Sequence, residues 1–122
     1  MTVAVNMEAA WLDVKSDIEL KIIRGEYSAG DRIPPVRKIA AIYSIGTTTA
    51  AKVLEHLYQE GTIYKKRGVG YFVKPYTKDR LCTEHKKNLE RIITDSFDYA
   101  DAIGVDMMVI VSQIYKVKDK KM

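Results

Sequence analysis

The sequence has little of what secreted, disulfide-bonded or membrane proteins need. It contains one cysteine, Cys82, which leaves no partner for a disulfide within the chain. The N-terminus lacks a basic start followed by an apolar segment, and apolar runs such as Met107 to Val111 fall far short of the roughly 18 residues of a membrane span. With 3 proline and 7 glycine residues and 47% hydrophobic residues, we expect a folded, soluble, cytoplasmic protein without membrane contact.

Residues that carry catalytic or metal chemistry are also scarce. Cys82 and His85 lie three positions apart and could form half of a zinc site, but a second pair is missing unless a dimer brings two such pairs together. Cys82 has no candidate base except His85, and the Gly68-Val69-Gly70 stretch is too short for a phosphate-binding loop. The 122 residues leave room for one small domain and a helical appendage. We therefore expect no enzyme, no cofactor and no metal.

Positive charge is concentrated in one segment. The formal net charge is +4, which permits a polyanionic partner without requiring one. Residues 61–75 contain Lys65, Lys66, Arg67 and Lys74 and no acidic residue, whereas residues 76–122 are nearly balanced. The positive charge is therefore local to residues 61–75.

The first half of the chain has the spacing of three helices. From Met7 to Arg24, apolar residues recur at intervals of three and four, which predicts an amphipathic helix. The pair Pro34-Pro35 suits the start of a short second helix, which ends before Ser44-Ile45-Gly46. A third helix is expected from about Thr47 to Glu60. Two short helices joined by such a turn form a helix-turn-helix.

A β-hairpin and further helices are expected next. Residues 62–65 and 71–73 are rich in β-branched and aromatic types and flank the turn Arg67-Gly68-Val69-Gly70, so the hairpin is a wing. Helical spacing returns over about 78–102 and 105–117, and the last five residues are expected to fray. The fold class expected is mainly α with a small β-wing. An N-terminal winged helix-turn-helix domain would cover residues 7–75, and a C-terminal two-helix segment residues 76–122.

Three blocks carry a resemblance to a known family. They are Gly30 to Ala40 (GDRIPPVRKIA), Leu57 to Ile63 (LYQEGTI) and Arg67 to Val73 (RGVGYFV). In their order and spacing they resemble the GntR family of bacterial transcription regulators, over roughly residues 10–74. Because only about 47 residues follow the wing, the chain is similar to the short YtrA-like branch of that family. The resemblance implies a DNA-binding regulator whose C-terminal helices mediate dimerisation.

The resemblance also implies which residues contact DNA in the helix-turn-helix. Arg37 would lie at the major groove, where its planar guanidinium can bind guanine O6 and N7; the alternative is an ion pair with Glu26 or Asp31. Thr47, Thr48 and Thr49 would begin the recognition helix and contact phosphates. Their alternative role is to cap the helix, and Thr49 could face the core.

Some positions depart from the usual family pattern. Pro35 replaces a phosphate-binding serine, Gly46 replaces a capping residue, and Thr47 and Ala51 replace arginines that often contact bases. These differences shift the expected base contacts to Arg37 and Lys52, whereas general phosphate binding is preserved. At the wing, the resemblance places Lys65, Lys66, Arg67 and Gly68 against phosphates or the minor groove; the alternative is an ordinary solvated hairpin.

The expected function is therefore a DNA-binding regulator, with repression as the expected sign, that acts as a homodimer on a palindromic operator in double-stranded DNA. The stripe of Leu89, Ile92, Ile93, Phe97, Met108 and Val111 needs a partner surface, although it could instead pack on the helix that holds Trp11. Family resemblance suggests adjacent transporter genes as targets and leaves open an unidentified small-molecule effector. The alternative function is a winged-helix protein-interaction module without DNA binding.

Overall fold

The computed structural model describes the backbone of residues 7–121. The chain divides into two compact units, the first ending at Cys82 and the second beginning at Thr83. Within the described residues, no helix is both long enough and apolar enough to cross a membrane.

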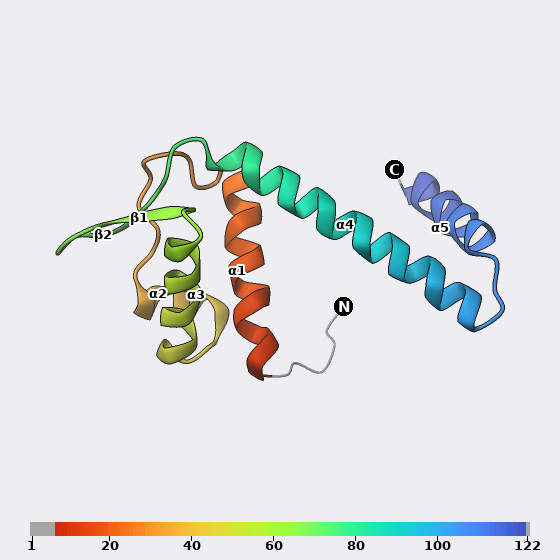
Figure 1. The fold of residues 1–122 in the computed structure, drawn as a ribbon, viewed down its shortest axis with the longest axis horizontal. Helices are drawn as coiled ribbons and strands as arrows, with labels where there is room; N and C mark the ends of the chain where they lie inside the picture. The colour runs from red at the N-terminus through yellow and green to blue at the C-terminus, as the bar shows by residue number, and fades with distance from the viewer. Residues whose placement is uncertain (1–6, 122) are drawn as a thin grey trace. The chain divides into compact units, whose positions relative to one another are not determined.

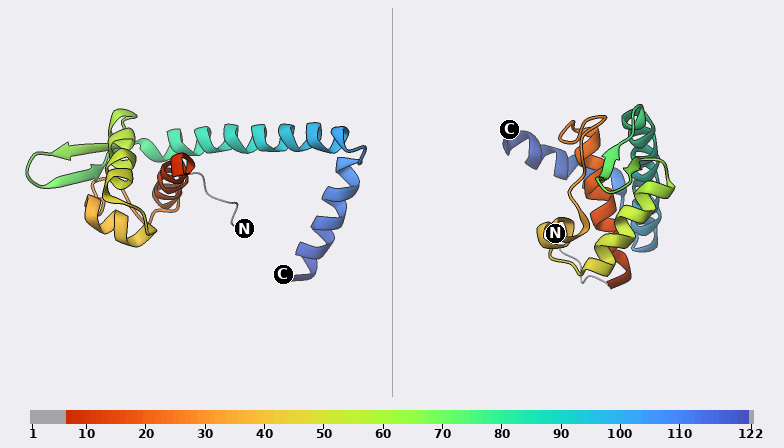
Figure 2. Two further views of the ribbon diagram at one scale, coloured as in Figure 1. Left: turned by 90° about the horizontal axis from the view of Figure 1, so that it is seen from below. Right: turned by 90° about the vertical axis from the view of Figure 1, so that its left-hand side faces the viewer.

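The first unit is a three-helix domain with a hairpin (Figure 1). Its elements are α1 (Met7–Ile23), α2 (Val36–Tyr43), α3 (Thr47–Gln59), β1 (Ile63–Lys66), β2 (Gly70–Val73) and the beginning of α4 (Thr77–Ala102). All bounds lie within two residues of the expected ones, and the fold class is confirmed. The hairpin projects past α2 in two perpendicular views (Figures 1 and 2).

One hydrophobic core holds these elements together. Each of the three helices contributes its apolar stripe, and Ile33, Ile63, Val73 and Leu81 add residues from the loop, the hairpin and α4. Most of these side chains are completely buried, and burying each one stabilises the fold by about 1.5–3 kcal/mol relative to leaving it exposed. Because α2 has only eight residues, its position depends on this packing and on contacts with α1.

The turn between α2 and α3 follows from its residues. Ser44 ends α2 in a left-handed conformation with φ of 53°, and the N–H groups there donate to the carbonyls of Ala40 and Ala41. Gly46 then precedes α3 in an extended conformation. The chain reverses within three residues, so the end of α2 lies beside the start of α3.

The hairpin is a regular antiparallel pair in which Ile63 pairs with Val73 and Lys66 with Gly70. Its turn is closed by the Val69 N–H, which donates to the Lys66 carbonyl at 2.9 Å. Arg67, Gly68 and Val69 form the exposed tip, and Gly68 has a φ of 76° that suits glycine. The tip is therefore a tight turn that carries one cationic side chain.

The second unit contains the remainder of α4 and α5 (Met107–Lys121). Asp106 explains why α5 begins two residues later than expected: its carboxylate accepts a hydrogen bond from the Met108 N–H at 2.9 Å. α5 extends to Lys121, four residues beyond the expected end of this helix, in a segment whose lysines favour helix; Met122 lies outside the described residues. Apolar side chains along both helices remain exposed.

Candidate nucleic-acid interface

Arg37 is the second residue of α2 and is exposed. Neither acidic residue considered as its partner pairs with it: Glu26 accepts from Arg24 with an Nε to Oε2 distance of 2.8 Å, and the Asp31 carboxylate accepts a hydrogen bond from the Ser28 N–H at 2.8 Å. Arg37 makes no hydrogen bond or ion pair with any residue that the structure describes. Its guanidinium is therefore open to an external anion or base edge.

The beginning of α3 is equally open. The first N–H of α3 with a helical acceptor is that of Ala50, which donates to the Gly46 carbonyl at 3.0 Å, and no side chain caps the helix. The threonines thus do not take the capping role. Thr47 and Thr48 are exposed, whereas Thr49 is half-buried and lines a cavity of about 440 Å³ beside Asp13, Tyr43 and other residues. Thr47 and Thr48 are the better-placed pair for an external phosphate.

Lys52 lies farther along α3 and is directed toward α1. Its Nζ is 4.7 Å from the centre of the Trp11 ring, and Trp11 also stacks on His56 with a centroid distance of 4.2 Å. A cation-π contact at an exposed site contributes only about 0.5–1 kcal/mol. Lys52 can therefore leave Trp11 for a phosphate or a base at small energetic cost.

The two wing lysines lie over aromatic rings. Lys65 Nζ is 5.8 Å from the Tyr71 ring centre, and Lys66 Nζ is 4.7 Å from that of Phe72. Because alternate residues of a strand point to opposite faces, the hairpin presents one lysine on each side. Arg67 at the exposed tip has no polar partner among the described residues. The wing thus carries positive charge on both faces and at its end.

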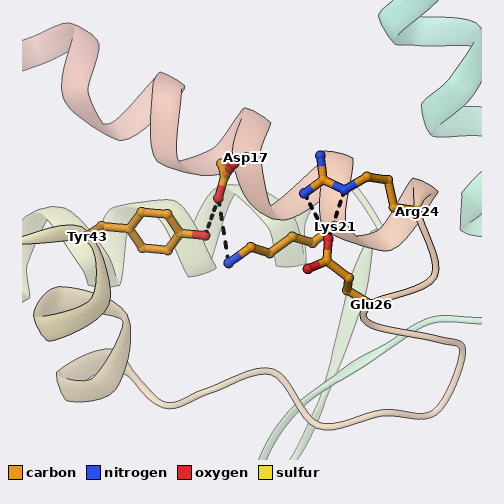
Figure 3. Close-up of polar contacts among 5 residues, drawn as sticks. All are labelled: Asp17, Lys21, Arg24, Glu26 and Tyr43. Atoms are coloured by element: carbon orange, nitrogen blue, oxygen red, sulfur yellow. Dashed lines mark hydrogen bonds and ion pairs between the residues drawn. The ribbon is translucent and has the colours of Figure 1, made fainter. Parts of the chain in front are cut away.

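A polar contact with α1 positions α2, as Figure 3 shows. The Tyr43 hydroxyl donates to Asp17 Oδ2 at 2.6 Å, and Lys21 Nζ lies 3.7 Å from the same oxygen. Burial raises the pKa of Tyr43 to about 12, and the hydrogen bond to Asp17 acts in the same direction. This contact anchors the end of α2 that leads into the turn before α3. This contact could not be found from the sequence, because Asp17 and Tyr43 are 26 positions apart and neither belongs to a motif.

Replacing Tyr43 by phenylalanine is expected to lower the free energy of unfolding of the first unit by about 1 kcal/mol. A hydrogen bond to a charged group contributes about 1.5–3 kcal/mol. The expected loss is smaller because the Tyr43 hydroxyl and Asp17 are partly exposed to water. Urea denaturation of the full chain, followed by Trp11 fluorescence, measures the change. Tyr58→Phe removes a hydroxyl that has no hydrogen bond in the described part of the chain and should leave stability unchanged.

The pH dependence provides an independent check of Tyr43. Its folded pKa of about 12 lies above the ordinary value of 10.0, so the neutral phenol is favoured by folding. The stabilising contribution is therefore complete below pH 10 and is lost as the pH rises from 10 towards 12. The stability difference between the wild type and Tyr43→Phe should shrink over that interval; a constant difference would contradict this role for the hydrogen bond.

A second polar contact joins α1 to α3. Lys15 Nζ lies 3.2 Å from Glu19 Oε2 and 3.0 Å from Glu60 Oε1. Burial acts to lower the pKa of Lys15, but hydrogen bonds to Glu60 and Glu19 and their negative charges together raise it. Lys15 thus stays charged and links α1 to the end of α3. Both helices of the helix-turn-helix are tied to α1 by charged or polar side chains.

The junction with α4 is also anchored in the first unit. The Arg80 guanidinium donates to the buried Thr62 hydroxyl at 2.8 Å, and the buried Thr77 hydroxyl donates to the Lys74 carbonyl at 2.8 Å. The described residues contain no group of three or more His, Cys, Asp or Glu side chains that could hold a metal ion.

Sequence comparison decides the family. Residues 12–73 match the family described as "Bacterial regulatory proteins, gntR family". The chain belongs to the GntR family. GntR proteins are DNA-binding transcription regulators, so regulation and not catalysis is what the matched region carries. The match covers α2, α3 and the wing, which contain all the predicted DNA contacts.

Individual relatives agree with this assignment. The HTH-type transcriptional repressor YtrA of Bacillus subtilis is 31% identical over 78 residues, which cover 61% of this chain and 60% of YtrA. A GntR family transcriptional regulator from Listeria monocytogenes has the same fold, with a TM-score of 0.73 and 20% identity over 95% of this chain and 98% of that one. The structure of AraR(DBD) in complex with operator ORE1 is 25% identical, with a TM-score of 0.50, over 52% of this chain and 78% of that one.

The chain spans only part of its curated relatives. It covers 25%, 28% and 60% of the lengths of the first three. The GntR assignment and the likeness to YtrA confirm the resemblance found in the sequence, whereas operators, effectors and assembly are questions for this chain itself.

Proposed function

We propose that this GntR protein is a repressor that binds a palindromic operator as a homodimer in the cytoplasm. The observation that carries this proposal is that the start of α2, the start of α3 and the wing each expose groups that can bind DNA and that have no partner in the described chain. Arg37 and Arg67 are exposed without polar partners in the described chain, and the N–H groups at the start of α3 are open. These three elements thus offer a guanidinium suited to base edges and several groups suited to phosphates.

The three elements suit adjacent features of duplex DNA. A recognition helix fits the major groove, which is about 12 Å wide, and a projecting hairpin can reach the neighbouring minor groove. The domain of AraR that resembles this chain was crystallised with its operator, which supports the same use of the domain here. YtrA is named a repressor, which supports repression as the sign. Transporter genes beside its own gene are the default targets that the family suggests.

The second unit supports the homodimer. Apolar residues of α4 and α5 that are between 40% and 60% exposed include Leu89, Ile92, Ile93, Phe97, Met108, Val111, Ile114 and Val117. Exposed apolar surface of this extent on two helices favours association. A two-fold dimer would present two copies of the first unit to the two halves of a palindrome.

Binding to DNA is tested directly by fluorescence anisotropy. The full chain is titrated into duplexes of about 30 base pairs that tile the DNA flanking its own gene, at salt concentrations between about 50 and 200 mM. We expect one duplex to bind far more tightly than the rest, and binding to weaken as salt rises. If a folded dimer binds no duplex even at low salt, the proposal is wrong and a protein-interaction module becomes the better description.

A further inference from the structure

The loop that leads into α2 forms a third strand-like edge beside the wing. The Gly30 N–H donates to the Val73 carbonyl, the Val73 N–H to the Asp31 carbonyl and the Ile33 N–H to the Tyr71 carbonyl, at 2.8–2.9 Å. An isolated β-bridge pairs Arg32 with Phe72. The segment just before α2 is therefore hydrogen-bonded to the edge of β2 that does not pair with β1 (Figure 1).

This attachment places the Arg32 guanidinium on the backbone of the wing. A Cβ atom added to Gly70 would lie 3.0 Å from Arg32 Nε and 3.3 Å from one of its terminal nitrogens. Gly70 also has a φ of 144°, a conformation that other residues rarely adopt. Glycine at position 70 thus provides the space in which the Arg32 side chain lies.

Arg32 is a cation without a protein partner. It is exposed, and it makes no hydrogen bond or ion pair with any residue in the described part of the chain. The neighbouring carboxylate of Asp31 instead accepts the Ser28 N–H. The side chain packs against Gly70, and its charge is not neutralised by an acidic side chain of the described chain. This arrangement is expected of a group that binds an external anion.

Arg32 lies between α2 and the wing, the two elements that carry the expected DNA contacts Arg37 and Arg67. Arg32 lines a hollow of about 150 Å³ whose other walls come from the start of α2, from Leu54 of α3 and from the wing residues Val69, Gly70 and Tyr71. No other charged side chain lines this hollow. Arg37 follows on α2 and Arg67 lies at the wing tip. Arg32 therefore lies between the element that suits the major groove and the element that suits the minor groove.

We propose that Arg32 binds a phosphate of the DNA strand that separates these two grooves. This inference rests on the proposed function. A helix in the major groove and a wing in the adjacent minor groove must lie on either side of one sugar–phosphate backbone. A guanidinium between them faces that backbone and can donate two hydrogen bonds to one phosphate. The contact would set the register of the domain on DNA and carry little base preference.

The test compares Arg32→Gln with Arg24→Gln. Each variant removes one exposed guanidinium, but Arg24 is paired with Glu26 at the end of α1. Arg32→Gln is expected to weaken binding to the tightest flanking duplex and to a random-sequence duplex by a similar factor, about tenfold. The slope of log Kd against log salt should fall by about 0.9 for each copy of the chain that binds. Arg24→Gln should retain the wild-type slope.

Duplexes with single methylphosphonate substitutions identify the atom that is bound. Neutralising one backbone phosphate between the grooves should weaken the wild type and leave Arg32→Gln unaffected. Arg32→Lys keeps the charge and should retain most of the salt slope, so it separates loss of charge from damage to the fold. Thermal unfolding of each variant provides the second check on folding.

The outcomes distinguish failure of this inference alone from failure of the proposed function. If the wild type and Arg24→Gln bind DNA and Arg32→Gln binds with the same affinity and slope, the phosphate contact is refuted and the proposed function remains. A loss confined to the tightest duplex would also overturn it, because that result indicates a base contact. If the wild type binds no duplex, both fail together.

Discussion

Arg37→Ala is expected to weaken binding to the tightest flanking duplex by roughly thirtyfold or more. A bidentate contact between arginine and guanine provides about 1–3 kcal/mol of discrimination, and a dimer on a palindrome contains two copies of the contact. Since 1.4 kcal/mol corresponds to a factor of ten, the combined loss of about 2–6 kcal/mol begins near thirtyfold. Anisotropy titration at fixed salt, with Arg24→Ala as the matched loss of an arginine, measures it.

The same variant should lose much less affinity for a random-sequence duplex. Non-specific binding depends on phosphate contacts, which the start of α3, the wing and Arg32 would still provide. An equal loss of affinity for both duplexes would show that Arg37 contacts the DNA backbone instead of a base. An unchanged affinity on both would remove it from the interface and would shift the search for specific contacts to α3.

The opposite behaviours of Arg37 and Arg32 distinguish two kinds of contact within one surface. A base contact changes the ratio of specific to non-specific affinity, and a phosphate contact changes the salt slope on every duplex. The sequence departs from the family pattern at Thr47 and Ala51, where arginines are common, so α3 offers few long side chains to bases. Sequence specificity would then depend mainly on Arg37, and affinity would depend on the contacts to DNA phosphates around it.

The order of elements could be predicted from the sequence because its signals are local. Apolar spacing predicted α1 and α3, the proline pair predicted the start of α2, and β-branched residues beside Gly68 and Gly70 predicted the wing. Each of these patterns lies within about 15 residues. The structure agrees with them to within two residues at every bound of the first unit.

The contacts that position the interface could not be predicted, because they join distant residues. Nothing near Asp17 indicates that it accepts a hydrogen bond from Tyr43, and the segment Gly30 to Ile33 lacks the alternation of a strand. Lys52 was expected to contact bases, but its direction depends on Trp11 of α1, which the pattern of α3 does not contain. Arg32 was overlooked for the same reason: its role depends on Gly70, 38 positions later.

Ile93→Asp is expected to convert the protein from a dimer to a monomer. Ile93 is 46% exposed in the single chain, so aspartate there should leave the chain folded but would bury a charge in the proposed dimer interface. Analytical ultracentrifugation should show the wild type at twice the 13.9 kDa chain mass and the variant near that mass. Thr94→Asp places the same side chain at the adjacent exposed position of α4, off the apolar stripe, and should remain dimeric.

Loss of the dimer should reduce operator affinity by about 10²–10⁴, because the second half-site is then no longer bound at the high effective concentration that linkage provides. Affinity for a duplex with one half-site should not change, since the first unit keeps its surface. If Ile93→Asp stays dimeric, Val111→Asp tests α5, where that side chain is 40% exposed. Two dimeric variants would place the interface elsewhere in the chain, and a monomer with undiminished operator binding would show that the palindrome is not bound by a dimer.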